Sequence, residues 1–263
     1  MNAFFSKNLK STALVTIPIY KEKPDALEMI SLKQCLKILA DYPIVFFYPQ
    51  ALDTRFYQNI CEEFEINPTL ESFEDHYFKN IQGYNALLIS KEFYKRFSVY
   101  EFMLIYQLDA FVFKDELQEW CAFNYDYIGS PWVYDDFVQS YNGIHAPLWS
   151  LAHWRKRINY GGNGGFSLRK ISSFLRFLHF FPFLTHDFKG NEDGFWSFYA
   201  DWYNPFFKIA PAETALQFAF EKHPEQSYQK LNQHLPFGCH AWHKYNINFW
   251  KPHLEQFGHH ITL

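Results

Sequence analysis

Ten residues in the middle of the chain, 104–113, limit its folding choices more than any other segment. They read Leu-Ile-Tyr-Gln-Leu-Asp-Ala-Phe-Val-Phe, and a run this apolar predicts a strand buried within a sheet. One residue near the end of the run, Asp109, is an acid, and an ionised carboxylate is very costly to bury alone. A nearby cation, a bound proton, or a place at the carboxyl end of the strand would resolve the conflict. Ligands bind at that edge of α/β sheets, so Asp109 is a candidate site residue.

The length and composition indicate a large globular protein that needs no disulfide bonds or structural metals to be stable. The chain has 263 residues and is 48% hydrophobic, which suits one large α/β domain spanning 1–263, or one domain with a small appendage. Its net charge of -4 gives no electrostatic case for binding nucleic acid. Aromatic residues make up 22%, and two explanations stay open: nucleotide bias in the source genome, or ring stacking on sugars or bases.

No segment indicates export or disulfide stabilisation. The first ten residues lack the apolar core of a signal peptide, and no run of about 18 apolar residues is present. The four cysteines lie far apart and form no Cys-x-x-Cys pair: Cys35, Cys61, Cys121 and Cys239. We therefore expect a reduced, cytoplasmic protein, for which peripheral contact with the inner face of a membrane stays open.

Apolar periodicity divides the chain into alternating strands and helices. Strands are predicted at 13–19, 43–48, 102–107, 125–132 and 161–169, with a short strand or turn at 73–78. Helices are predicted at 25–40, 55–64, 92–97, 171–179 and 191–199. We also expect a connector at 68–69 and a long loop at 134–160. The alternation predicts a Rossmann-like α/β fold, with a mixed and mainly parallel central sheet flanked by helices.

Gln107 and Asp109 form the first polar cluster. Being two residues apart, they project to the same face of a strand and can reach one ligand. A carboxylate and an amide oxygen suit a hard cation such as Mg²⁺ or Mn²⁺. The alternative is a buried acid that caps a neighbouring helix.

A glycine-rich run at 161–165, Gly-Gly-Asn-Gly-Gly, forms the second cluster. Four glycines in five positions indicate close backbone approach or positive φ angles, and exposed amides can bind a sugar or a phosphate. The spacing is not that of a dinucleotide fingerprint. The alternative is a tight structural turn.

Two further clusters lie towards the C-terminus. Glu192 and Asp193 open a helix, where they can complement the helix dipole or act as a general base with a neighbouring orienting acid. His240 follows Gly238-Cys239 and can ligate a divalent metal, although a lone histidine is more often structural.

Taken in order, these motifs resemble a nucleotide-sugar-dependent glycosyltransferase of the GT-A type, and most closely the DUF5672 family. The resemblance covers about 12–250 and is carried by the stretches 16–20, 104–113, 127–132, 162–169, 191–196 and 236–242. It implies a GT-A-like domain whose N-terminal half binds the nucleotide and whose C-terminal half binds the acceptor.

The resemblance also implies a metal site. GT-A enzymes carry an Asp-x-Asp motif that binds a divalent ion, Mn²⁺ or Mg²⁺, on the donor's diphosphate. Here Asp109 takes the second acidic position, while Gln107 stands in place of the first acid. His240 takes the place of a C-terminal metal-binding histidine. By the same resemblance, the residues expected to border the nucleotide base and ribose are Pro18, Ile19 and Tyr20.

A looser similarity to β-1,4-galactosyltransferases implies the catalytic roles. In those enzymes a glycine-rich segment lines the sugar site, which here implies donor contacts from Gly164 and Gly165. By that analogy Asp193 is the base of an inverting reaction, and Glu192 binds a hydroxyl of the sugar or acceptor. The implied donor is a nucleotide sugar, with a UDP-sugar as first candidate, and the implied acceptor is a saccharide or a lipid-linked glycan in polysaccharide biosynthesis.

Two rival functions remain. A non-catalytic sugar- or nucleotide-binding module with a degenerate transferase site is favoured by Gln107, because an acid usually stands there. A metal-dependent phosphohydrolase is disfavoured, because that class needs dense motifs of metal-binding acids and histidines.

Overall fold

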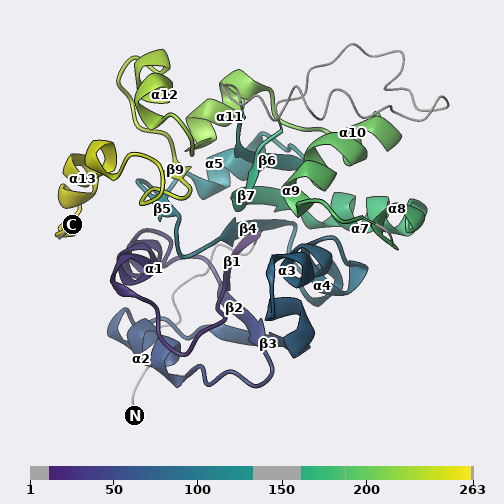
Figure 1. Ribbon diagram of the computed structural model, residues 1–263, viewed down its shortest axis with the longest axis horizontal. Coiled ribbons are helices and arrows are strands. Elements are labelled where there is room, and N and C mark those ends of the chain that lie inside the picture. The colour runs from purple at the N-terminus through teal and green to yellow at the C-terminus, as the bar shows by residue number, and fades with distance from the viewer. Residues whose placement is uncertain (1–11, 133–160, 187, 262–263) are drawn as a thin grey trace.

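The computed structural model of the protein describes residues 12–132, 161–186 and 188–261 (Figure 1). At its centre is a six-stranded sheet in which every strand except β7 runs in the same direction. The strands, in spatial order, are β3 (Thr69–Phe73), β2 (Ile44–Pro49), β1 (Ala13–Pro18), β4 (Phe102–Tyr106), β7 (Asn163–Lys170) and β6 (Tyr127–Ser130). The prediction of a mainly parallel α/β sheet is confirmed.

Helices cover both faces of the sheet, and Figure 1 shows α1 and α2 on one side of it and α3 and α4 on the other. One face packs against α1 (Ala26–Ile38), α2 (Arg55–Glu63), α5 (Leu117–Ala122) and α11 (Ala212–Phe218). The opposite face packs against α3 (Ile81–Leu88), α4 (Lys91–Arg96), α7 (Ile171–Phe180) and the helical stretch from α9 (Glu192–Gly194) through a π-helical turn (Phe195–Tyr199) to α10 (Ala200–Tyr203). Central strands therefore alternate their side chains between two cores.

Local chemistry explains why the first helix begins where it does. The Asp25 carboxylate accepts hydrogen bonds from the backbone of Leu27 and Glu28, and the Glu28 carboxylate accepts one from the Asp25 backbone. This reciprocal capping box satisfies donors that have no partner inside the helix. The predicted start of this helix at residue 25 is confirmed.

Some boundaries differ from the predictions. The prediction of a connector at 68–69 is wrong for Thr69, because β3 begins there. The segment 73–78, predicted as a short strand or turn, contains the last residue of β3 and a 3-10 turn (Asp75–Phe78). The expected loop at 134–160 lies outside the described residues. Helix α8 (Phe183–His186) also lacked a predicted counterpart. None of the helices in the described ranges is long and apolar enough to span a bilayer.

The apolar run 104–113 is not one strand. Strand β4 ends at Tyr106, the chain turns with a hydrogen bond from the Ala110 amide to the Gln107 carbonyl of 2.9 Å, and β5 (Phe111–Val112) joins a different sheet. The Tyr106 hydroxyl donates to the Ala110 carbonyl at 3.1 Å and helps to satisfy the turn. Apolarity was a correct sign of burial, but it did not distinguish one sheet from two.

The second sheet joins distant parts of the chain in the order β5, β9 (Gly238–Cys239) and β8 (Ala219–Phe220). It packs on α13 (Ile247–Glu255) through a core that includes Phe111, Trp242 and Trp250, and α12 (Pro224–Lys230) follows β8. Because β8 and β9 end beside the turn after β4, this small sheet brings C-terminal side chains to the edge of the main sheet.

Candidate functional site

The turn after β4 carries the two polar residues of the first predicted cluster. The Gln107 amide donates to the Gly165 carbonyl at 2.8 Å, which ties the turn to β7. Gln107 and Asp109 were predicted to lie on the same face of a strand, but both lie in the turn that follows β4. The turn still directs both side chains towards His240. They lie at the carboxyl edge of the parallel strands, where α/β proteins bind ligands.

Asp109 is a mostly buried carboxylate held between two cations. Its Oδ1 lies 3.0 Å from His240 Nε2, and its Oδ2 accepts a hydrogen bond of 2.8 Å from Lys244 Nζ. Burial alone would raise the pKa of Asp109, but His240 and Lys244 outweigh it and hold the pKa well below its usual range. Asp109 is therefore a permanent anion at any physiological pH.

His240 is oriented by a second acid. Its Nδ1 lies 3.1 Å from Glu221 Oε1, and its Nε2 lies 3.2 Å from Gln107 Oε1. Burial disfavours its charged form, but Asp109 and Glu221 outweigh burial and raise the pKa of His240 to about 10. The carboxylate on Nδ1 fixes the ring so that Nε2 faces Gln107 and Asp109, as second-shell carboxylates do for metal-binding histidines.

Glu221 is a site residue that the sequence reasoning missed. It follows β8 directly, is 6% exposed, and accepts a hydrogen bond of 2.9 Å from Asn163 Nδ2. The one available signal was an acid placed at the end of a short apolar run, which is the pattern that identified Asp109. The segment was overlooked because no helix or strand was predicted between 200 and 235.

The residues at Asp109 suit a hard divalent cation. Asp109 Oδ1 is a buried oxygen that lies 3.0 Å from His240 Nε2 and accepts no regular hydrogen bond within the described residues. Gln107 Oε1 offers a second oxygen, and His240 Nε2 would become a nitrogen ligand when the cation displaces its proton. No group of three or more His, Cys, Asp or Glu ligands is found among the described residues, so a cation here would also need water or substrate oxygens.

Glu192 belongs to a separate, fully buried ion pair. Arg169 Nη2 lies 2.8 Å from Glu192 Oε1, and both side chains are at most 5% exposed. The same guanidinium donates to the Tyr94 hydroxyl at 2.9 Å and to Ser167 Oγ at 3.0 Å. Glu192 Oε2 has no hydrogen-bond partner within the described residues. Glu192 therefore sits in a buried ion pair whose other partner, Arg169, is fixed by two further hydrogen bonds.

Asp193, the next residue, has the opposite character. It lies at the start of the helical stretch and accepts a hydrogen bond of 2.7 Å from the Gly194 amide. Burial and then the charge of Glu192 raise the pKa of Asp193 to about 7, and Glu221 contributes in the same direction. A carboxyl group with a pKa near neutrality is well matched to proton transfer.

The glycine-rich run lies between the two acidic clusters. A Cβ on Gly164 would collide with Glu192 Oε1, and a Cβ on Gly165 would collide with His240 Nε2. The predicted role of free amides is not seen at every position, because the Gly165 amide donates to Asn163 Oδ1 at 2.7 Å. These glycines leave room for the functional side chains.

A cavity of about 560 Å³ opens beside Asp109. Pro18 and Tyr20, from the end of β1, line it, whereas Ile19 is buried at 1% exposure and does not. Its other lining residues include Tyr84, whose hydroxyl accepts a hydrogen bond of 3.1 Å from Gln107 Nε2. The volume is in the range of small-ligand sites. We refer to this space as the donor cavity.

Comparison with known proteins identifies similar folds. No curated protein matches the sequence. Among solved structures, galactosyltransferase LgtC, in complex with donor and acceptor sugar analogues, matches with a TM-score of 0.52 at 13% identity, over 93% of this chain and 93% of that chain. Mouse xyloside xylosyltransferase 1, in its apo form, gives a TM-score of 0.52 at 10% identity, over 87% of this chain and 97% of that one. The apo bifunctional glycosyltransferase WbbM gives 0.51 at 12% identity, over 91% of this chain and 46% of its own.

At these identities the structural matches establish the fold. The sequence itself matches a family model over residues 67–240, which is more than half of the chain. The protein has a GT-A glycosyltransferase fold and belongs to DUF5672, a family described as proteins of unknown function.

Proposed function

We propose that the protein is a glycosyltransferase that moves a sugar from a nucleotide-diphosphate sugar to a hydroxyl group of a saccharide or glycan acceptor. One observation carries the proposal. Consecutive glycines, Gly164 and Gly165, bring Glu192, which is the chain neighbour of Asp193, and His240 of the Asp109 cluster against the same short segment, at the ligand-binding edge of the sheet. Sugar transfer needs a leaving-group site and a base site close to each other.

The donor cavity provides the nucleotide site. Tyr20 is 60% exposed at its rim and presents a ring face for a base, while Pro18 borders the expected ribose position. The diphosphate would then lie towards Asp109 and Lys244, which also line the cavity. A UDP-sugar is the first candidate donor.

Asp109, His240 and Gln107 are the residues that would hold a divalent cation, Mn²⁺ or Mg²⁺. When bound, the cation would act as a Lewis acid that stabilises the negative charge of the departing diphosphate. Lys244 adds a fixed positive charge beside the other carboxylate oxygen, Asp109 Oδ2. Glu221 keeps the His240 ring in the orientation that this role needs.

In the proposed transfer step, Asp193 acts as the base. The acceptor oxygen attacks the anomeric carbon on the face opposite the diphosphate, forming the new glycosidic C–O bond. The bond from that carbon to the diphosphate oxygen breaks, and its electron pair leaves with the diphosphate. Asp193 takes the proton of the acceptor hydroxyl, and one in-line displacement of this kind inverts the anomeric configuration.

Glu192 has a binding role in this scheme. Arg169 pairs with its Oε1, and its unpartnered Oε2 is an acceptor for a hydroxyl of the sugar or the acceptor. Because Glu192 is adjacent to Asp193, the hydroxyl that it orients is held near the base. The two neighbouring acids thus have different tasks.

A second candidate is a nucleotide- or sugar-binding module without transfer activity. The observation in its favour is that Lys244 and His240 already neutralise Asp109. The folded protein therefore needs no divalent cation to compensate this carboxylate. Gln107, in place of an acid, points the same way.

Thermal unfolding against a panel of nucleotides and nucleotide sugars, with and without Mn²⁺, tests the proposal. Selective binding raises the unfolding temperature by mass action. We expect a Mn²⁺-dependent shift with one nucleotide sugar that is lost in Asp109→Ala and kept in Asp41→Ala, because Asp41 is exposed and far along the chain from the site. Product analysis by NMR would then report the anomeric configuration. No shift with any nucleotide would reject the transferase.

A further inference from the structure

Five residues around His240 are joined by a closed circuit of short polar contacts. The Gln107 amide donates to the Gly165 carbonyl at 2.8 Å, and the Gly165 amide donates to Asn163 Oδ1 at 2.7 Å. Asn163 Nδ2 donates to Glu221 Oε1 at 2.9 Å, and the same oxygen lies 3.1 Å from His240 Nδ1. The circuit closes where His240 Nε2 lies 3.2 Å from Gln107 Oε1. Asn163 thus links the glycine-rich segment to the acid that holds His240.

One half of the Asn163 side chain serves its own strand. The pairing between β7 and β6 is interrupted between Asn163 and Ser167, and the three residues between them have no partner on β6. The bond from the Gly165 amide to Asn163 Oδ1 spans two residues, which makes it an Asx-turn. The carbonyl half of the Asn163 amide therefore supports the backbone at this bulge.

The other half of the Asn163 side chain faces a buried acid. Glu221 is 6% exposed, and within the described residues the groups that contact its carboxylate are Asn163 Nδ2 and His240 Nδ1. Both contacts converge on Oε1, so the Asn163 amide fixes the oxygen that faces His240. A buried carboxylate needs such contacts, because a buried charge without them is costly.

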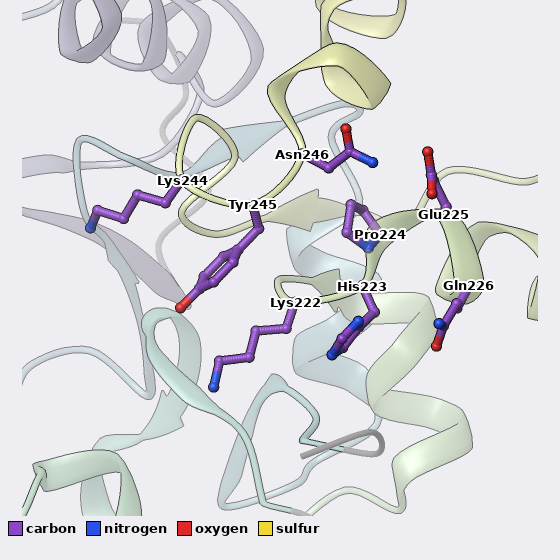
Figure 2. Close-up of a pocket in the computed structure, with 8 residues that line it drawn as sticks. All are labelled: Lys222, His223, Pro224, Glu225, Gln226, Lys244, Tyr245 and Asn246. Carbon is purple, nitrogen blue, oxygen red and sulfur yellow. The ribbon is translucent and has the colours of Figure 1, made fainter. Parts of the chain in front are cut away.

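The loops beyond the two short strands give this carboxylate little support. Figure 2 shows residues 222–226, which follow Glu221, and residues 244–246, which lie between β9 and α13, lining one cavity of about 330 Å³. A backbone bond of 2.9 Å from the His240 amide to the last residue of β8 aligns the strands but does not act on the Glu221 side chain. The amide contact therefore determines where the Glu221 carboxylate points.

We propose that Asn163 is a positioning residue of the site, which holds the Glu221 carboxylate against the His240 ring. The ring then stays directed at the cation site that it forms with Asp109. The inference rests on the proposed transferase function, because the orientation of His240 matters when a cation binds beside the donor diphosphate. Asn163 acts through Glu221 in this scheme and contacts neither substrate.

Two substitutions separate the two contacts of the Asn163 side chain. In Asn163→Ser the side chain is too short to reach Glu221, but its hydroxyl can still accept the Gly165 amide. Asn163→Asp keeps the shape and the turn acceptor, and it replaces the donor with an oxygen that repels Glu221. The matched controls are Asn248→Ser and Asn248→Asp, because Asn248 is exposed on α13 and lines neither this cavity nor the donor cavity. A native unfolding temperature identifies a folded variant, and one folded Asn163 variant suffices for the test.

The first measurement is the NMR signal of the His240 Nδ1–H group, which needs neither nucleotide nor metal. The signal is assigned by its absence in His240→Gln. We expect its exchange with solvent to be at least about tenfold faster in the Asn163 variants, because the acceptor oxygen is no longer fixed, and native-like in the Asn248 variants. An unchanged exchange rate would overturn the proposal, whatever reaction the protein catalyses.

The second measurement is Mn²⁺ affinity in the presence of UDP, or whichever nucleoside diphosphate stabilises the protein most. We expect Asn163→Ser alone to lower it about tenfold, but less than about twofold when Glu221→Gln is already present, because residues that act through one contact are not additive. Fully additive losses would show that Asn163 acts by another route and would also overturn the proposal. If the native protein binds no nucleoside diphosphate, the transferase function is rejected, and the His240 signal still decides whether Asn163 positions Glu221.

Discussion

Asp109 and Asp193 are two largely enclosed aspartates that the fold treats in opposite ways. Burial by itself raises the pKa of both carboxyl groups. Beside Asp109 the nearest charges are the cations of His240 and Lys244, which lower its pKa well below the usual range. Beside Asp193 the nearest charge is that of Glu192, which raises its pKa further, to about 7.

The difference shows how one proposed site can hold a fixed charge and a proton acceptor. The cation closest to the second cluster, Arg169, is engaged by Glu192 at 2.8 Å, so Asp193 has no such partner of its own among the interactions that the structure shows. Asp109 is therefore suited to binding a cation beside the diphosphate, and Asp193 to proton transfer.

Replacing the base should have the largest effect. Asp193→Asn keeps the shape of the side chain but removes the proton acceptor, so we expect the transfer rate to fall about 10²–10⁴-fold. Donor affinity should stay close to the native value, which calorimetry would show. Asp41→Asn serves as the exposed control. Undiminished transfer would remove Asp193 from the role of base.

Neutralising Asp109 should abolish the effect of the cation on the donor. In Asp109→Asn we expect the factor by which Mn²⁺ strengthens nucleotide binding to fall by more than about 100-fold, because a charged ligand is lost. Nucleotide affinity without Mn²⁺ is the internal control. If Mn²⁺ strengthens nucleotide binding equally in the variant, Asp109 is not a ligand.

The pH dependence of transfer should follow Asp193 alone. The base must be deprotonated, and its pKa is about 7, so the rate should rise as pH increases through about 7 and fall about tenfold per pH unit below it. Asp109 should add no step there, because its pKa lies far lower. The measurement is kcat/KM between pH 5 and 9, and a flat profile across neutrality would contradict the assignment.

The orienting acid should have a smaller effect. Glu221→Gln leaves His240 in place but weakens the contact on Nδ1, so we expect Mn²⁺ affinity in the presence of nucleotide to fall about 10–100-fold. Glu213→Gln, at an exposed position on α11, is the matched control. Equal affinity in both variants would assign Glu221 a structural role only.

Sequence reasoning found residues whose chemistry conflicts with their surroundings. Asp109 was identified because a charge interrupts an apolar run. The glycine-rich run was identified because four glycines in five positions indicate close backbone approach or positive φ angles. The resemblance supplied His240, and the structure places it 3.0 Å from Asp109. Five of the six strands of the main sheet were predicted from periodicity, since strands buried on both faces have a strong apolar signature, and β3 was not.

Residues that act through distant partners could not be predicted. Glu221, Arg169 and Lys244 acquire their roles only when β8, β7 and the segment after β9 come together at one sheet edge. Their contacts join residues 19, 23 and 135 positions apart, and no local pattern identifies the partners. The single-strand interpretation of 104–113 failed for a related reason, because burial in two different sheets leaves the same apolar sequence.

The adjacent glycines have a consequence for the precision of the site. Gly164 meets Glu192 and Gly165 meets His240, so the two chemical centres rest on neighbouring α-carbons. Consecutive α-carbons across a trans peptide are about 3.8 Å apart, a distance set by covalent bonds. One peptide unit of β7 therefore lies between Glu192 and His240, and a side chain added at either glycine would displace one of these two groups.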